Sequence, residues 1–263
     1  MGKIDLRKSE IMKMLSVYRN LNVDAIVREL GVSDATIRRT LNALEQEGKI
    51  IRTHGGARLA PQFTPEYSFL KQAAINIKQK EMIGRCAASI VEQRDILFLD
   101  SGTTVLSVAK VLARRIESKE ITDLSIVTNS IIVGEVLGNL CKVFLLGGEV
   151  RLSRKDISGP IAEKFIRMFR ANRAFIGADA LSINDGLMTT DTYTSRIEEE
   201  MIKRSDQVVL VADSSKFNKY SMVSFARLTD IDLIITDNQL SEEIKREYEE
   251  HGTRILIAEN NAR

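Results

Sequence analysis

From residue 75 onward, short apolar runs alternate with helical stretches, and this alternation restricts the possible folds more than any other feature of the sequence. The apolar runs are residues 96–99, 125–127, 143–146, 174–176, 208–211 and 233–235. The helical stretches that separate most of them are residues 105–116, 131–140, 161–169 and 194–204. Strands that are apolar on both faces and are joined by helical crossovers predict a mostly parallel sheet covered on both sides. We therefore expect an α/β domain, with a leading helix at 75–91 and an additional edge strand at 255–258.

Residues 1–60 carry a different pattern, with three helices expected before a short basic hairpin. The second helix covers 23–30 and stops at Gly31, a residue that suits the left-handed end of a helix. The third starts at the N-cap residue Ser33 and ends at Gly48. Two helices joined by a short turn in this way form a helix-turn-helix unit, whose second helix enters the major groove of DNA.

The third helix has an apolar face and a polar face. Ile37, Leu41 and Leu44 follow helical spacing and are expected to face inward. The outward positions that we expect to contact DNA are Ser33, Ala35, Thr36, Arg38, Arg39 and Asn42. Arginine can pair bidentately with guanine and asparagine with adenine, so this face suits base recognition. Periodicity leaves one alternative open, which is a helical bundle with a solvated arginine face.

Residues 49–52 and 57–59 flank a glycine-containing turn and predict a two-stranded wing. The wing residues expected to contact phosphates or the minor groove are Arg52, His54, Gly55, Gly56 and Arg58, with the glycines acting through exposed amides. Residues 1–60 hold 11 Lys and Arg against 7 Asp and Glu, whereas the remainder of the chain holds 27 against 29. The positive excess coincides with the predicted DNA-binding unit, although an excess of this size is weak support by itself.

Composition argues against several other classes of protein. No apolar run is long enough to span a bilayer, and no charged-then-apolar signal pattern opens the chain. Cys86 and Cys141 lie among apolar neighbours and are expected to be buried thiols in a reducing compartment. Two separate histidines and no Cys/His cluster argue against a metal site. We therefore expect a cytoplasmic protein with no membrane contact, no metal and no cofactor.

Two prolines mark the expected boundary between the two parts of the chain. Pro61 and Pro65 follow the hairpin, and proline favours extended linker backbone over helix. The expected domains are residues 1–60 and residues 75–263, with a linker at 61–74. The third proline, Pro160, stands where a helix should begin, a position that proline favours.

Residues 7–58 resemble the N-terminal domain of the DeoR family of bacterial transcriptional regulators. The residues that carry the resemblance are Val32-Ser33, Thr36-Ile37-Arg38-Arg39, Leu41-Asn42, Leu44-Glu45, Gly48 and Arg52-Thr53-His54-Gly55-Gly56-Ala57. The resemblance implies a winged helix-turn-helix that binds DNA. The family usually has an acidic residue after the two arginines, where this chain has Thr40. This departure could alter how the helix docks or which base it prefers.

Polar and glycine-containing loops follow five of the apolar runs. In an open α/β sheet, ligands bind outside the carboxyl ends of the strands, so these loops predict one polar pocket. The residues expected to bind an effector there are Asp100, Ser101, Gly102, Thr103, Thr104, Thr128, Asn129, Ser130, Gly147, Gly148, Glu149, Gly177, Ala178, Asp179, Thr189 and Lys216.

These loops suit a phosphorylated ligand with hydroxyl groups. The 100–104 loop opens a helix, and backbone amides at a helix N-terminus bind phosphate. Lys216 can supply a cation, while Asp100, Glu149 and Asp179 can accept hydrogen bonds from hydroxyls. An ordinary turn remains the alternative for the loop, and a helix cap or turn role remains the alternative for each carboxylate.

This second part of the chain also resembles the DeoR family, so the resemblance spans about residues 7–237. The matching segments are Leu99-Asp100-Ser101-Gly102-Thr103-Thr104, Val127-Thr128-Asn129-Ser130, Leu146-Gly147-Gly148, Phe175-Ile176-Gly177-Ala178, Gly186-Leu187-Met188-Thr189-Thr190 and Ala212-Asp213-Ser214-Ser215-Lys216-Phe217. The family domain is similar in fold to ribose-5-phosphate isomerase. The resemblance implies a phosphorylated sugar as effector, usually the inducer of a repressor of sugar metabolism.

Two departures from the family concern ligand contacts. Many family members have Glu-Ala before the helix that continues to a lysine, where this chain has Ser195-Arg196. Arg154 and Lys155 follow the Gly147-Gly148 loop, where they could tune anion binding or be solvated.

Two other functions remain possible from the sequence. The chain could be a sugar-phosphate isomerase with a DNA-binding domain, or an architectural DNA-binding protein whose second domain only oligomerises. Isomerisation through an enediol needs a positioned carboxylate base and groups that stabilise the oxyanion. The related isomerases carry an acidic residue at the start of the Gly-Ala-Asp loop, a Lys-Gly-Gly-Gly segment and a downstream glutamate. The corresponding positions here hold Ile176, residues 188–190 and residues 194–195, so the resemblance implies phosphate and sugar binding without turnover. One helix-turn-helix contacts little DNA, and we expect a homodimer or homotetramer on a double-stranded operator.

Overall fold

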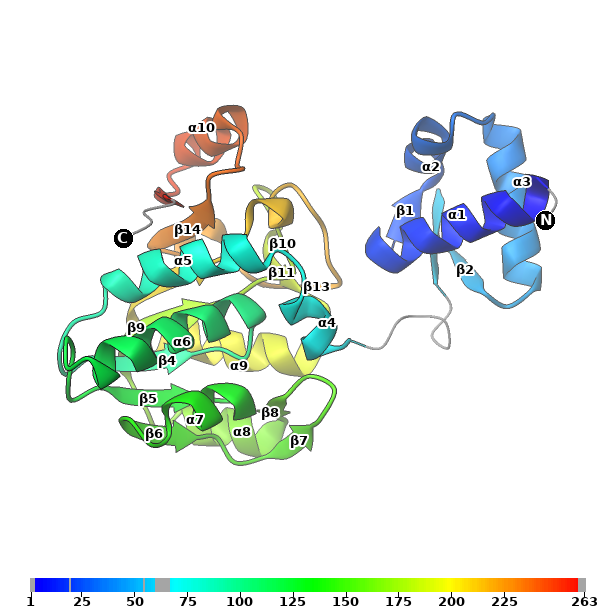
Figure 1. The fold of residues 1–263 in the computed structure, drawn as a ribbon. Coiled ribbons are helices and arrows are strands. Elements are labelled where there is room, and N and C mark those ends of the chain that lie inside the picture. The colour runs from blue at the N-terminus through cyan, green and yellow to red at the C-terminus, as the bar shows by residue number, and fades with distance from the viewer. Residues whose placement is uncertain (1–2, 19, 54, 60–66, 260–263) are drawn as a thin grey trace. The chain divides into compact units, whose positions relative to one another are not determined.

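The computed structural model describes residues 3–18, 20–53, 55–59 and 67–259, and the chain divides into two compact units, Met1–Tyr67 and Ser68–Arg263 (Figure 1). Pro61 and Pro65 lie outside the described residues. The expected linker, residues 61–74, is partly helical. Helix α4 (Phe69–Ala73) lies within it, belongs to the second unit and buries Phe69. Within the described ranges, no helix is both long and apolar enough to cross a membrane.

The first unit contains the three expected helices. They are α1 (Lys3–Tyr18), α2 (Val23–Leu30) and α3 (Asp34–Gln46). Gly31 ends α2 in the left-handed conformation, with φ of 63°, and its N–H donates to the carbonyl of Val27. The core residues are Ile11, Leu15, Val23, Ile26, Ile37, Leu41, Leu44, Ile50, Ala57 and Leu59. Burial of each large aliphatic side chain contributes roughly 1.5–3 kcal/mol, so this core fixes which face of α3 is exposed.

The wing has three strands where the sequence predicts two. β2 (Ile50–Thr53) and β3 (Gly56–Leu59) form the expected hairpin, and β1 (Asn20–Asn22) pairs with the other side of β3. The short Asn-Leu-Asn segment carries no strand pattern. Gly56 is buried, and a Cβ there would lie 2.1 Å from the carbonyl oxygen of Leu21. The expectation of an exposed Gly56 amide is therefore wrong, because glycine permits the close approach of β1 and β3.

The second unit is built on a seven-stranded parallel sheet, which confirms the predicted α/β class. Its strands are β4 (Ile96–Leu99), β5 (Ser125–Thr128), β6 (Lys142–Leu145), β9 (Ala171–Ile176), β12 (Ser205–Val211), β14 (Leu233–Asp237) and β15 (Ile255–Ala258). Their order is β15-β14-β12-β9-β4-β5-β6, and each neighbouring pair is parallel. The sheet therefore grows outward in both directions from β4 and β9. This pair is the topological switch point, where open α/β sheets bind ligands.

Helices cover both faces of the sheet (Figure 1). On one face lie α5 (Ile77–Ser89), α6 (Thr103–Glu117) and α7 (Ile131–Leu137), and on the other lie α8 (Pro160–Ile166) and α9 (Thr192–Lys203). Pro160 is the first residue of α8, as predicted. A further helix, α10 (Glu242–Glu250), packs through its buried Tyr248.

Short strands outside the main sheet were not predicted, and they bring additional residues to the switch point. β7 (Glu149–Arg151) pairs with β8 (Asp156–Ser158), and β10 (Ala180–Ser182), β11 (Gly186–Thr189) and β13 (Val223–Ala226) form an antiparallel sheet. The N–H of Ile157 in β8 donates to the carbonyl of Asn129 at 2.8 Å. The β7–β8 hairpin is thereby attached to the loop that follows β5.

Candidate functional site

The outward face of α3 presents the side chains expected to contact DNA. Those that are exposed are Ser33, Ala35, Arg38, Arg39 and Asn42, and Thr36 is half-buried. Ser33 is the N-cap residue of α3, and its hydroxyl lies 2.8 Å from that of Thr36. On the other side of the helix, Ile37, Leu41 and Leu44 are fully buried. The core thus leaves the polar face available, as a recognition helix requires.

The cations of this surface differ in their partners. Arg38 pairs with Asp34, with Nε 2.5 Å from Oδ1, and this hydrogen bond raises the pKa of Arg38. Arg39 and Arg58 are exposed, and neither side chain forms a hydrogen bond or an ion pair with another described residue. Gly55 is exposed at the turn of the wing. Arg39 and Arg58 are therefore the cations most available to a phosphate or a base.

Three further expectations for this surface have different outcomes. Thr40 is buried, and its hydroxyl donates to the carbonyl of Thr36 at 2.9 Å, so the residue that departs from the family pattern faces away from DNA. Arg52 is half-buried and donates from Nη1 to Oδ1 of Asn42 at 2.9 Å, which links the wing to α3. His54 lies outside the described residues.

At the switch point, Asp100 joins the loops that follow β4 and β9. Its carboxylate accepts hydrogen bonds from the backbone N–H groups of Ser101, Gly102 and Gly177. The residue is 2% exposed, and burial raises its pKa although the three N–H groups favour the charged form. The sequence suggests Asp100 as an acceptor for ligand hydroxyls, but backbone amides already occupy both of its oxygens. Asp100 therefore holds the two loops together.

Helix α6 begins at this junction with an open first turn. Its N-cap residue, Gly102, has no side chain to cap it, and the first helical hydrogen bond runs from Leu106 N–H to the Gly102 carbonyl at 3.0 Å. The N–H groups before Leu106 have no acceptor within the helix. Thr103 is half-buried and Thr104 is buried. A helix of 15 residues directs the positive end of its dipole to this point, which suits an anion.

The loop after β5 is buried beside Asp100. The hydroxyl of Thr128 donates to the carbonyl of Leu99 at 2.6 Å, and that of Ser130 accepts from a backbone N–H at the start of α7. Nδ2 of Asn129 lies 3.5 Å from the hydroxyl of Ser101. Oδ1 of Asn129 is buried and has no hydrogen-bond partner in the described part of the chain. Thr128 and Ser130 are thus occupied by the fold, while Asn129 retains a free acceptor.

A network of ion pairs that the sequence did not reveal lies next to these loops. Arg151 donates to both oxygens of Asp156 at 2.9 and 2.6 Å, to Asp191 at 2.6 Å, and to the hydroxyl of Thr194 at 2.9 Å. Burial by itself would raise the pKa of Asp191, but the hydrogen bonds from Arg151 and Thr194 lower it. Arg154 lies 3.6 Å from Asp156, so it is not the solvated cation that the sequence left possible. The network ties the β7–β8 hairpin to the start of α9.

Glu198 of α9 lies close to this network. It is 3% exposed, and its Oε2 has no hydrogen-bond partner among the residues that the structure describes. Burial raises the pKa of Glu198 well above its usual range, Asp100 and Asp179 raise it further, and Arg154 opposes the shift. Asp179, in the loop after β9, accepts a hydrogen bond from the hydroxyl of Thr189 at 3.3 Å.

One lysine, Lys80, lies near the start of α6, and a second, Lys216, acts electrostatically on the first. Lys216, in the short helix η2 (Ser214–Lys216), is half-buried. Lys80 of α5, which sequence reasoning missed, is 5% exposed and donates to the carbonyls of Gln72 and Ile75 at 2.6 and 2.8 Å. Burial lowers the pKa of Lys80 to about 8, an effect that Asp213 opposes and Lys216 reinforces. The charges of Lys80 and Lys216 therefore act on each other.

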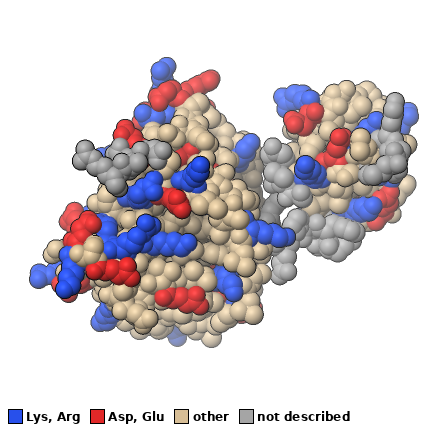
Figure 2. Space-filling model, in the orientation of Figure 1, with Lys and Arg blue, Asp and Glu red and all other residues tan. Residues whose placement is uncertain are grey.

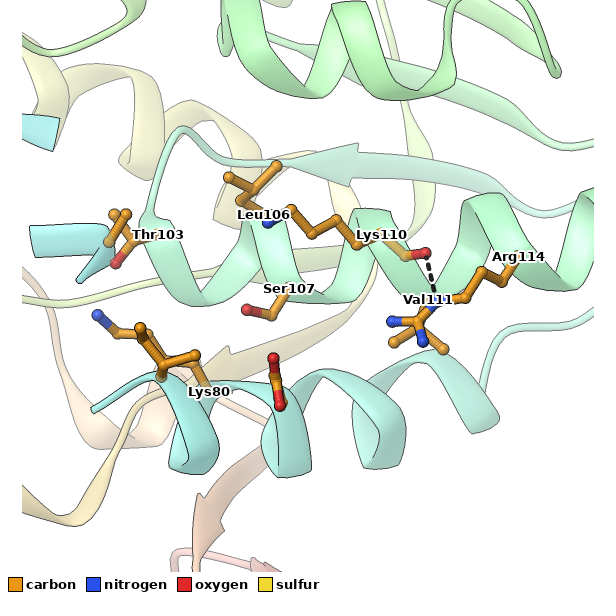
Figure 3. A pocket seen from close by; sticks show the side chains of 10 residues that line it. Lys80, Thr103, Leu106, Ser107, Lys110, Val111 and Arg114 are labelled. Carbon is orange, nitrogen blue, oxygen red and sulfur yellow. Dashed lines mark hydrogen bonds between the residues drawn. The ribbon is translucent and has the colours of Figure 1, made fainter. Parts of the chain in front are cut away.

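A small pocket of about 80 Å³ lies between α5 and α6 (Figure 3). Thr103 and Lys80 line one end of it, and the Lys80 amine points toward Thr103 in this view. Lys110 and Arg114 line the pocket farther along α6, where Nε of Arg114 donates to the Lys110 carbonyl at 3.4 Å. The pocket lining thus carries Lys80, Lys110 and Arg114 against one carboxylate, that of Glu81.

The loop after β6 leads into the β7–β8 hairpin and is exposed. Gly147, Gly148 and Glu149 are exposed, and β5 separates β6 from the switch point. A Cβ on Gly148 would lie 2.6 Å from the carbonyl oxygen of Ser158, which shows that this loop packs on β8. Glu149 begins β7, two residues before Arg151, and its role as an acceptor for ligand hydroxyls stays a prediction.

The site thus combines a cationic part with an acidic part. The acidic part comprises Asp100, Asp156, Asp179, Asp191 and Glu198. The guanidinium groups of Arg151 and Arg154 compensate part of this negative charge. On the visible face of the second unit, cationic and anionic side chains are intermixed (Figure 2). No three His, Cys, Asp or Glu side chains within the described ranges are placed to hold a metal ion. A phosphate ester with hydrogen-bond donors at its other end matches this arrangement.

Comparison with known proteins gives two family matches. Residues 7–63 match the DeoR-like helix-turn-helix domain, and residues 75–238 match the DeoR C terminal sensor domain. The HTH-type transcriptional regulator GlpR of Haloferax volcanii is 33% identical over 95% of this chain and 96% of its own length. The lactose phosphotransferase system repressor of Lactococcus lactis subsp. lactis is 32% identical over 96% of this chain and 98% of its own.

Among solved structures, ribose 5-phosphate isomerase A from Methanocaldococcus jannaschii aligns with 54% of this chain and 55% of its own. The TM-score is 0.41 and the sequence identity is 17%. A likeness of this size supports no conclusion about activity.

Proposed function

This chain belongs to the DeoR family of transcriptional regulators, and we propose that it is a repressor whose affinity for operator DNA is set by a phosphorylated sugar. The observation that carries the proposal is the open first turn of α6 at the switch point, with Lys80 beside Thr103. One relative is named as a repressor of a lactose phosphotransferase system, which supports an operon of sugar uptake or catabolism as the target. The relatives are regulators, and they lend no support to an isomerase.

The first unit supplies the DNA-binding part of this function. Its exposed Arg39 and Arg58 are free to meet bases or phosphates. A single unit contacts few base pairs, so two copies would bind half-sites about one helical turn, roughly 34 Å, apart. The second unit would join the copies into a homodimer or a homotetramer. Such a regulator acts in the cytoplasm, on the DNA of the cell.

The second unit supplies the ligand-binding part. The phosphate would lie on the N–H groups that open α6, with the hydroxyl of Thr103 and the amine of Lys216 as side-chain donors. The buried Oδ1 of Asn129 would accept a hydrogen bond from the sugar. The ligand can shift DNA binding only by the difference between its affinities for the DNA-binding and the released arrangements.

The substitutions Thr103→Val and Lys216→Ala test this site. Each should abolish the ligand response, because each removes a phosphate donor, while operator binding without ligand stays as in the wild type. The measurement is the melting temperature of the full chain with a panel of pentose and hexose monophosphates, since a ligand that binds only the native state raises it. Lys203→Ala, at an exposed position of α9, is the matched control for loss of a positive charge. Unaltered ligand-induced shifts in both site variants would show that the phosphate binds elsewhere.

A further inference from the structure

Glu198 differs from the other carboxylates of the site because the fold leaves it without a partner. Asp156 and Asp191 are held by Arg151, Asp100 by backbone N–H groups, and Asp179 by the backbone N–H of Thr190 and a threonine hydroxyl. Oε2 of Glu198 is buried, yet no described residue donates to it. Buried polar groups in native proteins are nearly always hydrogen-bonded, because an unpaired one costs free energy. The missing partner is therefore expected from outside the chain.

The position of Glu198 directs it toward the switch point. Thr194, Ile197, Glu198 and Met201 are all buried and form one stripe of α9 at helical spacing. One turn before Glu198 on this stripe, Thr194 already contacts Arg151. The charged and titratable groups that act on Glu198 come from the β4 loop (Asp100), the β9 loop (Asp179), the segment before α9 (Asp191) and the β7–β8 hairpin (Arg154).

Burial and the acidic surroundings determine which protonation state of Glu198 is favoured. Burial and the neighbouring carboxylates raise its pKa well above the usual range, so the neutral acid is favoured. A neutral carboxyl group carries one O–H donor and one carbonyl acceptor. Two adjacent hydroxyl groups of a sugar offer the complementary acceptor and donor.

We propose that the carboxyl group of Glu198 hydrogen-bonds two hydroxyl groups of the effector and thereby selects polyhydroxylated phosphate esters over inorganic phosphate. This role rests on the proposed function, because it assumes that the phosphate lies at the start of α6. Glu198 would be the specificity-determining residue of the site, and the α6 amides would provide the phosphate affinity that all such esters share.

Two substitutions of similar size separate hydrogen bonding from shape. Glu198→Gln keeps a donor and an acceptor, and its affinity for the best-binding pentose or hexose monophosphate should stay within a few-fold of wild type. Glu198→Leu removes both, and its affinity should fall on the order of tenfold or more. Inorganic phosphate, which has no sugar hydroxyls, should bind wild type and both variants equally. Calorimetric titration of the full chain measures all three affinities.

The pH dependence provides a readout that a purely structural residue would not give. Wild-type affinity for the sugar phosphate should fall as pH rises through the raised pKa of Glu198, because the neutral form of the carboxyl group is lost, and Glu198→Gln should lack this fall. The glutamine variant retains the titration of the ligand itself, so it is the control for that effect.

The stability of the ligand-free protein should also fall as pH rises. A carboxyl group whose pKa is raised in the folded state destabilises the fold as pH rises through that pKa. The ligand-free glutamine and leucine variants should therefore melt at or above the wild-type temperature, and the difference should grow with pH.

Three results would contradict the role of Glu198 alone. The first is equal sugar-phosphate affinity in wild type and Glu198→Leu. The second is a parallel loss of inorganic phosphate and sugar-phosphate binding in Glu198→Leu. The third is a lowered melting temperature of ligand-free Glu198→Gln, which would mean that the carboxyl group already has a hydrogen-bond partner within the fold. If neither sugar phosphates nor inorganic phosphate bind the wild type, the proposed function itself fails, and the role of Glu198 fails with it.

Discussion

Replacing Arg39 by alanine should weaken operator binding by about 1–3 kcal/mol, or roughly 5- to 150-fold. The Arg39 side chain is exposed on α3 and forms no hydrogen bond or ion pair with another described residue, so DNA can engage it without breaking a bond. Arg38, one residue earlier, is paired with Asp34 and must leave that partner before it can contact a base. Arg39→Ala should therefore cost more than Arg38→Ala. Fluorescence anisotropy on a duplex selected by the wild-type protein from random sequence measures both losses.

The substitution Arg39→Lys distinguishes a contact of Arg39 with a base from a contact with a phosphate. Lysine keeps a phosphate contact but cannot reproduce the planar, bidentate pairing of arginine with guanine. If Arg39 reads a base, Arg39→Lys should lose most of the affinity and relax the preference at one position of the selected duplex. Retained affinity in Arg39→Ala would contradict the assignment of α3 as the recognition helix.

Replacing Asp156 by alanine should lower the free energy of unfolding of the second unit by about 3–5 kcal/mol. Asp156 is 1% exposed and accepts two hydrogen bonds from Arg151, while Arg154 lies 3.6 Å away. Removal of the Asp156 carboxylate leaves the partly buried guanidinium groups of Arg151 and Arg154 with less negative charge beside them. A buried charge without a partner lowers the free energy of unfolding. Hydrogen exchange along a urea series, followed by mass spectrometry, reports the two units separately.

Asp206→Ala is the matched control for this loss. Asp206 also pairs with an arginine, Arg170, but both side chains are largely exposed, at 64% and 74%. Exposed pairs contribute about 0–1 kcal/mol, so this variant should unfold almost as the wild type does. If Asp156→Ala and Asp206→Ala cost the same, the Arg151 network does not stabilise the site. A smaller loss in Asp156→Leu with Arg151→Met than in Asp156→Ala would further identify the unpaired charge as the cause.

The main sheet could be predicted because its strands are buried on both faces and read as continuous apolar runs. β4 and β15 have the predicted bounds. β9 and β12 each begin three residues earlier than predicted, because their first residues include polar side chains such as Asn172 and Asp206. Pairing with neighbouring strands, which periodicity does not contain, extends the ladder over these polar residues.

The site could be predicted only in part. Topology places the loops after β4 and β9 at the switch point, so Asp100 and Gly177 were found, although Asp100 turned out to be a structural acceptor. Asp156 could not be found, because a short polar hairpin without periodicity brings it to the site through contacts distant in sequence. Glu198 did carry a signal: it occupies the apolar stripe of α9 together with Ile197 and Met201. A carboxylate on an inward stripe indicates either a buried pair or a ligand contact.

The most direct test of ligand-controlled DNA binding is the affinity of the full chain for its selected operator duplex, measured with and without each sugar phosphate that raises the melting temperature. At least one such compound should weaken operator binding tenfold or more, about 1.4 kcal/mol, in the wild type. The same compound should have no effect on Thr103→Val. Operator affinity that stays constant with every stabilising sugar phosphate would contradict the claim that the second unit controls the first.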